Sequence, residues 1–287
     1  MTASNDPEAD DLRCAMARLD PCIRAHGPML VACSGGVDSA FLAVAAHRVL
    51  AGRMLCVLGV SPSLARAEKA SATAFFEAQG LPHRILATHE MDDARYRANG
   101  PDRCFYCKHE LFGGIERLPE AAHFAVIAYG ANVDDRFDHR PGARAARAHR
   151  VCAPLAEAGF TKAMVRAAAR DLGLAVWDKP ASPCLSSRIP YHSEVTPEKL
   201  RQIDEAESVL KGLGFDVCRV RHHGETARIE VSFDAITRLR RSDVWSVVDT
   251  GVRAAGFERV EVDERGFQSG RLNDALPRTA LTPNEEV

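Results

Sequence analysis

The run from residue 29 to residue 40 constrains the fold most, because an apolar strand pattern passes through two glycines directly into an apolar helical pattern. Gly35 and Gly36 can adopt backbone angles closed to other residues, so successive N–H groups can face an anion at the positive end of the following helix. Ser34 and Ser39 add hydroxyl donors. The sequence therefore predicts a phosphate-binding loop, and a plain strand-to-helix connection is the alternative.

The string Ser-Gly-Gly-Val-Asp-Ser at residues 34–39 resembles the PP-loop of ATP pyrophosphatases. No lysine follows the glycines, which distinguishes this loop from the Walker type. The resemblance implies that the loop holds the pyrophosphate half of ATP while a nucleophile attacks the α-phosphate. Asp38 is then expected to act through Mg²⁺, because its charge beside phosphates needs a counter-ion. An acid in the first turn of a helix is the alternative for Asp38.

Strand patterns alternate with helical patterns along the first half of the chain. Strands are predicted at residues 29–33, 54–60, 83–87 and 124–128, and helices at 39–51, 63–79 and 108–116. This order predicts an α/β fold of the PP-loop (adenine nucleotide alpha hydrolase-like) type, a parallel sheet with helices on both faces and ligands beyond the carboxyl ends of its strands. The turn with Ser61 and Ser63 follows the second strand, where PP-loop proteins pack the adenine side of ATP. A helix N-cap is the other role for Ser63.

The pattern changes near residue 180. Prolines between residues 177 and 183 prevent regular structure there. A capped helix to about residue 212, strands at 215–221 and 227–232, two helical patterns and a last strand at 259–262 follow. We therefore expect a PP-loop domain over residues 1–180, a smaller α+β substrate or sulfur-transfer domain over 181–268, and a disordered tail over 269–287.

Charge and hydropathy narrow the class of protein. The 287 residues carry a formal charge of −2, which gives no general basic field for nucleic acid. No apolar run approaches the roughly 18 residues of a membrane span, and the amino terminus is acidic and polar. We expect a cytoplasmic protein with a small-molecule substrate and no nucleic-acid or membrane partner. In that compartment the nine cysteines are expected to be reduced, catalytic or metal-bound.

Three cysteines stand out by their context. Cys104 and Cys107 form a Cys-x-x-Cys pair, and Cys184 stands between prolines and close to Arg188. We expect each site to lie in a loop after a sheet element. A nearby positive charge favours the thiolate of Cys184, and a structural core cysteine is the alternative. A Cys-x-x-Cys pair alone serves redox, zinc and iron–sulfur sites alike.

With these motifs the chain resembles the LarE family, ATP-dependent sulfur transferases that synthesise pyridinium bisthiocarboxylate mononucleotide, the precursor of a nickel-pincer cofactor. The resemblance covers nearly the whole chain, and the string around Cys184 is its most specific part. It implies that a carboxylate of pyridinium biscarboxylic acid mononucleotide attacks the α-phosphate of ATP, pyrophosphate leaves, and the acyl-adenylate accepts sulfur. Lactate racemase is one user of the cofactor. The family also gives the expectation of a homo-oligomer, a hexamer built from trimers.

The resemblance leaves two sources of sulfur open. In single-cysteine members, the thiolate matching Cys184 displaces AMP, and later C–S cleavage leaves dehydroalanine in the protein. Other members carry three cysteines that match Cys104, Cys107 and Cys184, hold a 4Fe-4S cluster, and are proposed to donate a sulfide bound at its open iron. We favour the cluster, because three thiolates can occupy three corners of a cubane and leave one iron free. A zinc or redox pair beside a sacrificial Cys184 is the alternative.

A set of arginines is expected to bind the substrate. Arg219 and Arg221 share one face of a strand, and together with Arg188 they resemble the family's anion site for a phosphate or carboxylates. A solvated strand face is the alternative. Glu207 and Glu230 match acidic family positions that contact metal or substrate, with solvated surface glutamates as the alternative.

Three other functions stay open at this point. Ammonia-dependent amidation needs a glutaminase partner or domain, which we do not find in the sequence. Thiolation of transfer RNA needs a basic RNA-binding extension, which the near-neutral charge does not support. A non-catalytic sulfur or cluster carrier would bind nucleotide for regulation only, and release of pyrophosphate in the presence of substrate would exclude it.

Overall fold

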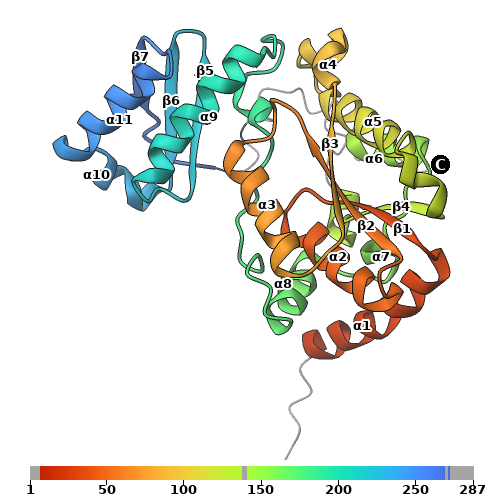
Figure 1. Ribbon diagram of the computed structural model, residues 1–287. Helices are drawn as coiled ribbons and strands as arrows, with labels where there is room; N and C mark the ends of the chain where they lie inside the picture. Colours follow the sequence, from red (N-terminus) through yellow and green to blue (C-terminus); the bar gives the residue numbers. More distant parts are fainter. Residues whose placement is uncertain (1–6, 138–140, 269–270, 272–287) are drawn as a thin grey trace, which may run out of the picture.

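The computed structural model describes residues 7–137, 141–268 and 271. Figure 1 shows a large α/β unit built on one sheet and a small unit built on a second sheet. The elements of the α/β unit are, in chain order, α1 (Pro7–His26), β1 (Met29–Ala32), α2 (Val37–Leu50), β2 (Met54–Val60), α3 (Arg66–Ala78), β3 (His83–Ala87), η1 (Glu90–Asp92), α4 (Ala94–Arg97), α5 (Arg103–Glu116), η2 (Pro119–His123), β4 (Val126–Tyr129), η3 (Val133–Phe137), α6 (Pro141–Ala148), α7 (Pro154–Glu157) and α8 (Lys162–Asp171).

The sheet of the α/β unit is parallel, with the strand order β3-β2-β1-β4. Side chains alternate across it, because successive residues of a strand point to opposite faces. Met29 and Val31 of β1 belong to the core cluster that includes α1, α2, α3 and α8, whereas Leu30 and Ala32 belong to the cluster with α5 and α6. Both faces of the sheet are therefore covered, as the alternation of strands and helices predicted.

The small unit continues after a connecting segment, residues 172–196, which contains the short helix η4 (Leu185–Arg188). Strands β5 and β6 form the predicted antiparallel hairpin, turning at Gly224 with a φ of +65°, and β7 pairs with β6 in parallel. Its own apolar cluster includes side chains of α9 and α11 packed on this sheet. The elements are α9 (Pro197–Gly212), β5 (Cys218–His223), β6 (Thr226–Val231), η5 (Phe233–Ala235), α10 (Ile236–Leu239), α11 (Ser242–Ala254) and β7 (Arg259–Val262).

A separate apolar cluster joins the connecting segment to both units. Leu185 and Ile189 are buried there together with Tyr96 of α4 and Leu200 and Ile203 of α9. The segment around Cys184 is thus packed between the α/β unit and the small unit. The expected fold class, a parallel PP-loop sheet with a smaller C-terminal α+β part, is confirmed, and the domain boundary near residue 180 stays a prediction.

Two elements differ from the sequence-based expectation. Helix α1 was not predicted, although Ala15, Leu19 and Ile23 form a buried stripe on it, because the region is acidic and has a proline at position 21. Helix α5 begins at residue 103 instead of residue 108. The predicted tail at residues 269–287 lies outside the described residues, apart from residue 271. Within the described ranges, no helix is long and apolar enough to cross a membrane.

Candidate active site

The predicted phosphate loop requires glycine at position 35, where the loop after β1 passes close to α3. Gly35 has a φ of +76°, and a Cβ atom at this position would lie 2.8 Å from the Cβ atom of Ala72. Gly36 is the N-cap of α2 and supplies no capping side chain, so the first N–H groups of the helix are left for another partner. Ser39 Oγ donates to the Gly36 carbonyl (3.1 Å) and accepts from the Ser34 N–H (3.2 Å). The loop has the glycines and the free helix end that an anion needs.

Asp38 of α2 is held by two side chains from distant segments. Lys162, the first residue of α8, forms an ion pair with its carboxylate, and Asn132 Nδ2 donates to Asp38 Oδ1 at 3.3 Å. The Lys162 N–H in turn donates to Asp134 Oδ2 at 2.8 Å. The carboxylate therefore already has a cationic partner, and its Mg²⁺ role stays a prediction. Lys162 was not predicted as a site residue.

A second lysine reaches the phosphate loop from the proline-rich segment. Lys179 Nζ donates to the Gly35 carbonyl at 3.2 Å and forms an ion pair with Glu68 of α3 at 2.8 Å. Burial is the largest single influence on the pKa of Glu68 and raises it. The hydrogen bond and the charge of Lys179, with smaller contributions from other groups, together outweigh burial, so the pKa lies below its usual value. The loop thus has two lysines beside it that come from outside its own motif.

The turn after β2 is joined to an acid that was not predicted. Ser61 Oγ and Ser63 Oγ both hydrogen-bond to Glu90 Oε1, at 2.5 and 3.2 Å. Glu90 is only 3 % exposed, and its Oε2 atom has no hydrogen-bond partner among the described residues. Glu90 lies three residues after β3, so the rule that placed Ser61 beyond the carboxyl end of β2 could have found it too.

A cavity of about 130 Å³ brings the nucleotide motifs and two of the predicted cysteines together. The backbone links the same regions, because the Leu185 N–H donates to the Ser63 carbonyl at 2.8 Å. The three predicted cysteines, Cys104, Cys107 and Cys184, are thiols, of which the first is exposed and the other two are partly buried. The lining residues that matter here are Ser34, Ser61, Ser63, Glu90, Cys107, Lys108 and Cys184.

The expected loop position of the Cys-x-x-Cys pair is wrong. Cys104 and Cys107 lie in the first turns of helix α5, directly after Pro101 and Asp102, and only Cys184 precedes its short helix in a loop. Asp102 occupies the N-cap position of α5, so the helix begins at residue 103, before both cysteines. Burial, then the charge of Glu90, then that of Cys184, raise the pKa of Cys107 well above its usual value. The start of α5 and the loop around Cys184 are therefore close in space.

The loop around Cys184 is held by guanidinium groups. The donor–acceptor pairs are Arg188 to Pro183 O (2.6 Å) and Cys184 O (3.1 Å), Arg103 to Ser186 O (2.9 Å), Arg219 to Ala181 O (2.8 Å), and Arg221 to Ser187 O (2.8 Å). Each bond is assisted by the arginine charge, which makes it stronger than a bond between neutral groups. These arginines fix the backbone on which Cys184 is carried.

Buried acids balance part of this charge. Arg188 forms a two-bond ion pair with Glu207 (2.8 and 3.0 Å), and both side chains are 2 % exposed. Glu230 accepts from Arg221 at 2.8 Å and from Arg271 at 3.0 Å. Glu207 and Glu230 are therefore buried, and the alternative that placed them on a solvated surface is wrong.

Arg219 lies in a surplus of positive charge. It is buried, and burial followed by the neighbouring Arg188 lowers its pKa below the usual value. Glu207 opposes this shift, whereas Arg221 adds to it. A surplus of this kind favours an anion beside the guanidinium groups. Arg219 and Arg221 hold the backbone around Cys184, Glu207 pairs with Arg188, and Glu230 pairs with Arg221, whereas the cavity is lined by other residues.

Comparisons with known proteins identify relatives of this chain. No family model matches the chain. An uncharacterized protein of Synechocystis sp. is 39 % identical over 249 residues, covering 87 % of the chain and 93 % of the relative. The pyridinium-3,5-bisthiocarboxylic acid mononucleotide synthase of Lactiplantibacillus plantarum is 33 % identical over 260 residues, covering 88 % of the chain and 91 % of that protein. One component of the glutamine-hydrolyzing GMP synthase of Thermoplasma acidophilum is 28 % identical over 208 residues, covering 66 % of the chain and 64 % of that protein. The chain therefore belongs to the LarE family of PP-loop sulfur transferases.

Proposed function

We propose that this enzyme converts the carboxylates of pyridinium biscarboxylic acid mononucleotide into thiocarboxylates at the expense of ATP, in the synthesis of a nickel-pincer cofactor. The observation that carries the proposal is the shared cavity, in which Cys107 and Cys184 face residues that follow β1 and β2. The kinship with a synthase of the bisthiocarboxylic acid mononucleotide supports the same substrate class.

The first half-reaction is adenylation. The phosphate loop binds the β- and γ-phosphates, Ser61 and Ser63 lie on the adenine side, and a substrate carboxylate attacks the α-phosphate, so that pyrophosphate leaves. Lys162 and Lys179 stand beside the loop and can take up the charge of the departing pyrophosphate. Mg²⁺ bound near Asp38 would compete with Lys162 for the carboxylate, and release of this lysine toward the phosphates satisfies both groups.

The second half-reaction delivers sulfur. The donor set of Cys104, Cys107 and Cys184 fits a 4Fe-4S cluster, because Cys107 and Cys184 line one cavity and Cys104 lies one turn before Cys107 on α5. When bound, the cluster would supply an iron without a protein ligand, at which exogenous sulfide can bind. The protein holds the Cys184 backbone through Arg188 and Arg103 and keeps the acyl-adenylate next to the thiols.

The substrate phosphate belongs beside the arginines of β5. The three guanidinium groups of Arg188, Arg219 and Arg221 outnumber the two carboxylates of Glu207 and Glu230. In this arrangement the two glutamates orient the guanidinium groups, and the mononucleotide supplies the missing negative charge. The same arginines hold the Cys184 loop, so the substrate and the sulfur donor share one support.

The source of sulfur is tested by anaerobic reconstitution with iron and sulfide, followed by absorption and EPR spectroscopy and by iron analysis. We expect a broad absorption band at about 400 nm in the wild type. Cys104→Ala and Cys107→Ala should each lose this band. Cys14→Ala is the matched control, because Cys14 is exposed on α1 and belongs to another part of the chain.

Intact-mass measurement after turnover separates the two sulfur sources. If the wild type binds no cluster and loses one sulfur at Cys184, the chain is a single-use donor and the cluster proposal is wrong. Absence of pyrophosphate release with ATP and the mononucleotide would contradict the enzyme proposal itself and would favour a carrier. Light scattering of the purified protein tests the expected homo-oligomer.

A further inference from the structure

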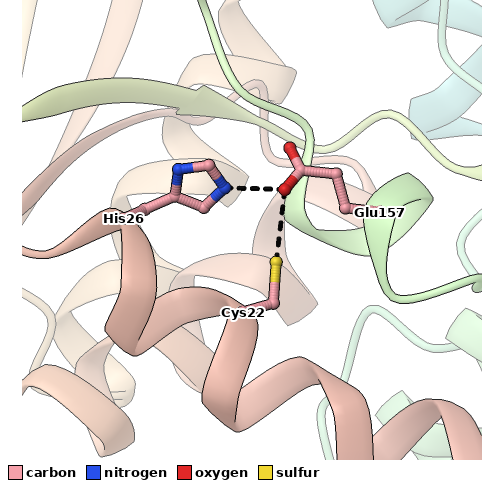
Figure 2. Close-up of side chains that lie close together, drawn as sticks. All are labelled: Cys22, His26 and Glu157. Atoms are coloured by element: carbon pink, nitrogen blue, oxygen red, sulfur yellow. Dashed lines mark hydrogen bonds and ion pairs between the residues drawn. The ribbon is translucent and has the colours of Figure 1, made fainter.

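Three metal-ligating side chains meet outside the active site, where α1 contacts α7. Figure 2 shows Cys22 and His26 on α1 pointing toward Glu157 at the end of α7. One ligand atom from each of the three lies within 4.8 Å of the others. Cys22 and His26 are four residues apart, which places them on the same face of the helix. Neither the phosphate loop nor the cysteine cavity uses these side chains.

Two further hydrogen bonds fix the seam between the two helices and the orientation of Glu157. Arg18, one turn before Cys22 on α1, donates through Nε to the Ala158 carbonyl at 2.9 Å. The other carboxylate oxygen of the acid, Glu157 Oε1, accepts from the Ala153 N–H at 3.0 Å. Glu157 is thus oriented by its own helix, and its Oε2 atom faces α1. This is the kind of supporting hydrogen bond that orients a metal ligand.

The distances suit a tetrahedral ion of zinc size. Glu157 Oε2 lies 3.3 Å from Cys22 Sγ and 2.6 Å from His26 Nε2. Ligand atoms about 2.0–2.3 Å from a tetrahedral zinc stand roughly 3.3–3.6 Å apart. The sulfur–oxygen distance already agrees, and the imidazole has to retreat by less than about 1 Å. A site made of a thiolate, an imidazole and a carboxylate binds Zn²⁺ in preference to Mg²⁺ or Ca²⁺.

We propose that Cys22 Sγ, His26 Nε2 and Glu157 Oε2 bind a Zn²⁺ ion that fastens α1 to α7. On binding, Cys22 loses its thiol proton to solvent, and the neutral imidazole of His26 provides the lone pair of Nε2. Glu157 and His26 are partly exposed, so water has access to the fourth position. The ion would link the amino-terminal helix to the segment that leads into α8, without any new backbone contact.

The test uses the full-length chain with Cys104→Ala and Cys107→Ala, so that the Cys-x-x-Cys pair cannot compete for metal. The protein is stripped of metal under anaerobic conditions and titrated with Zn²⁺ alone. We expect one equivalent to bind, and the midpoint of thermal unfolding to rise by on the order of 5 °C at a hundredfold excess over Kd. Co²⁺ in place of Zn²⁺ should show the absorption of a tetrahedral site with a thiolate ligand.

Variants at the three ligands decide the proposal. In the same background, Cys22→Ser, His26→Ala and Glu157→Gln should each lose the equivalent of Zn²⁺ and the rise in midpoint, and the exposed Cys14→Ser on the same helix should keep both. If His26→Ala and Glu157→Gln bind Zn²⁺ as the parent does, the site is elsewhere and the proposal is wrong. Failure of the parent to bind any Zn²⁺ would also overturn it. Both readouts are independent of sulfur transfer.

Discussion

The two sides of the active-site cavity are built in different ways. The nucleotide side consists of short segments that each follow a strand of the parallel sheet, with Ser34 after β1, Ser61 after β2 and Glu90 after β3. The sulfur side consists of the first turns of α5 and the loop around Cys184, which are far apart in the chain. The first side depends on the sheet, whereas the second depends on charged side chains.

In the function proposed above, this difference assigns the two half-reactions to differently built parts of the site. A parallel sheet brings the ends of its strands to one edge, so the positions of Ser34, Ser61 and Glu90 follow from the sheet itself. The Cys184 loop is held through its carbonyls by four arginines, and Arg188 in turn depends on Glu207. A change to Arg103, which holds the loop through the Ser186 carbonyl and has no proposed substrate contact, should therefore disturb sulfur transfer and leave adenylation intact. Changes to Arg219 or Arg221 should weaken both half-reactions, because these arginines are also proposed to bind the substrate.

Replacement of Cys184 should have the largest effect. We expect Cys184→Ala to lower thiocarboxylate formation by on the order of 10³-fold or more, because the sulfur side loses a thiol required under either sulfur source. Pyrophosphate release should continue. Asp38→Asn is the counterpart on the nucleotide side and should stop both. Mass spectrometry of the product and a coupled pyrophosphate assay provide the measurements, and loss of pyrophosphate release in Cys184→Ala would show that the two sides are not separable.

Removal of one partner of the buried Arg188–Glu207 pair should have the next largest effect, on stability. Arg188→Met leaves a buried carboxylate uncompensated, so the free energy of unfolding should fall by roughly 3–5 kcal/mol. Arg188→Met combined with Glu207→Leu should recover a large part of this loss, since no buried charge is left unpaired. Urea unfolding of the three proteins measures both values. Equal stability of the single and double variants would mean that the ion pair contributes little to holding the loop.

Two glycines with a positive φ make a matched comparison on the nucleotide side. Gly35→Ala adds a Cβ atom 2.8 Å from the Ala72 Cβ atom, whereas Gly52→Ala at a φ of +86° meets nothing within 4 Å. Both variants should lose about 1–2 kcal/mol of stability from the left-handed backbone. Gly35→Ala should lose about 1–3 kcal/mol more from the clash and should no longer bind ATP. Calorimetric titration with ATP and urea unfolding check this, and normal ATP affinity in Gly35→Ala would contradict the loop assignment.

The smallest expected effect links the two sides. Glu90→Gln removes a negative charge that raises the pKa of Cys107, so this pKa should fall toward the ordinary thiol value. At a fixed neutral pH, alkylation of Cys107 should become several-fold faster, because more of it is thiolate. Peptide mapping after timed alkylation follows this single cysteine. Glu77→Gln, exposed on α3, is the control and should leave the rate unchanged.

The sequence predicted the nucleotide side better than the sulfur side. The Ser-Gly-Gly-Val-Asp-Ser string and the strand order were enough to place Ser34 and Ser61 at one edge of the sheet, since both rest on local patterns. Glu90 followed from the same rule but was missed, because it lies three residues beyond the end of β3, at the start of the short helix η1. Helix α1 was missed because its acidic start and its internal proline obscure an apolar stripe with a spacing of four residues.

The lysines and arginines show what local patterns cannot provide. Lys162 pairs with Asp38 across 124 positions of sequence, and Lys179 contacts Gly35 across 144. A lysine on a helix or in a loop is usually solvated, so nothing in either neighbourhood pointed to the phosphate loop. The buried state of Arg188, Glu207 and Glu230 was equally hidden, because burial depends on what packs over a side chain.

The sequence alone determined the parallel sheet and the glycine-bearing loop and singled out three cysteines by their context, because backbone preferences and hydrophobic periodicity act within a few residues. The tertiary structure decided that Cys107 and Cys184 share a cavity and that arginines hold the loop around Cys184. It also decided that Cys22, His26 and Glu157 meet where α1 contacts α7. The physical reason is that charged and sulfur-bearing side chains acquire their chemistry from burial and from partners, and both are supplied by segments distant in the chain.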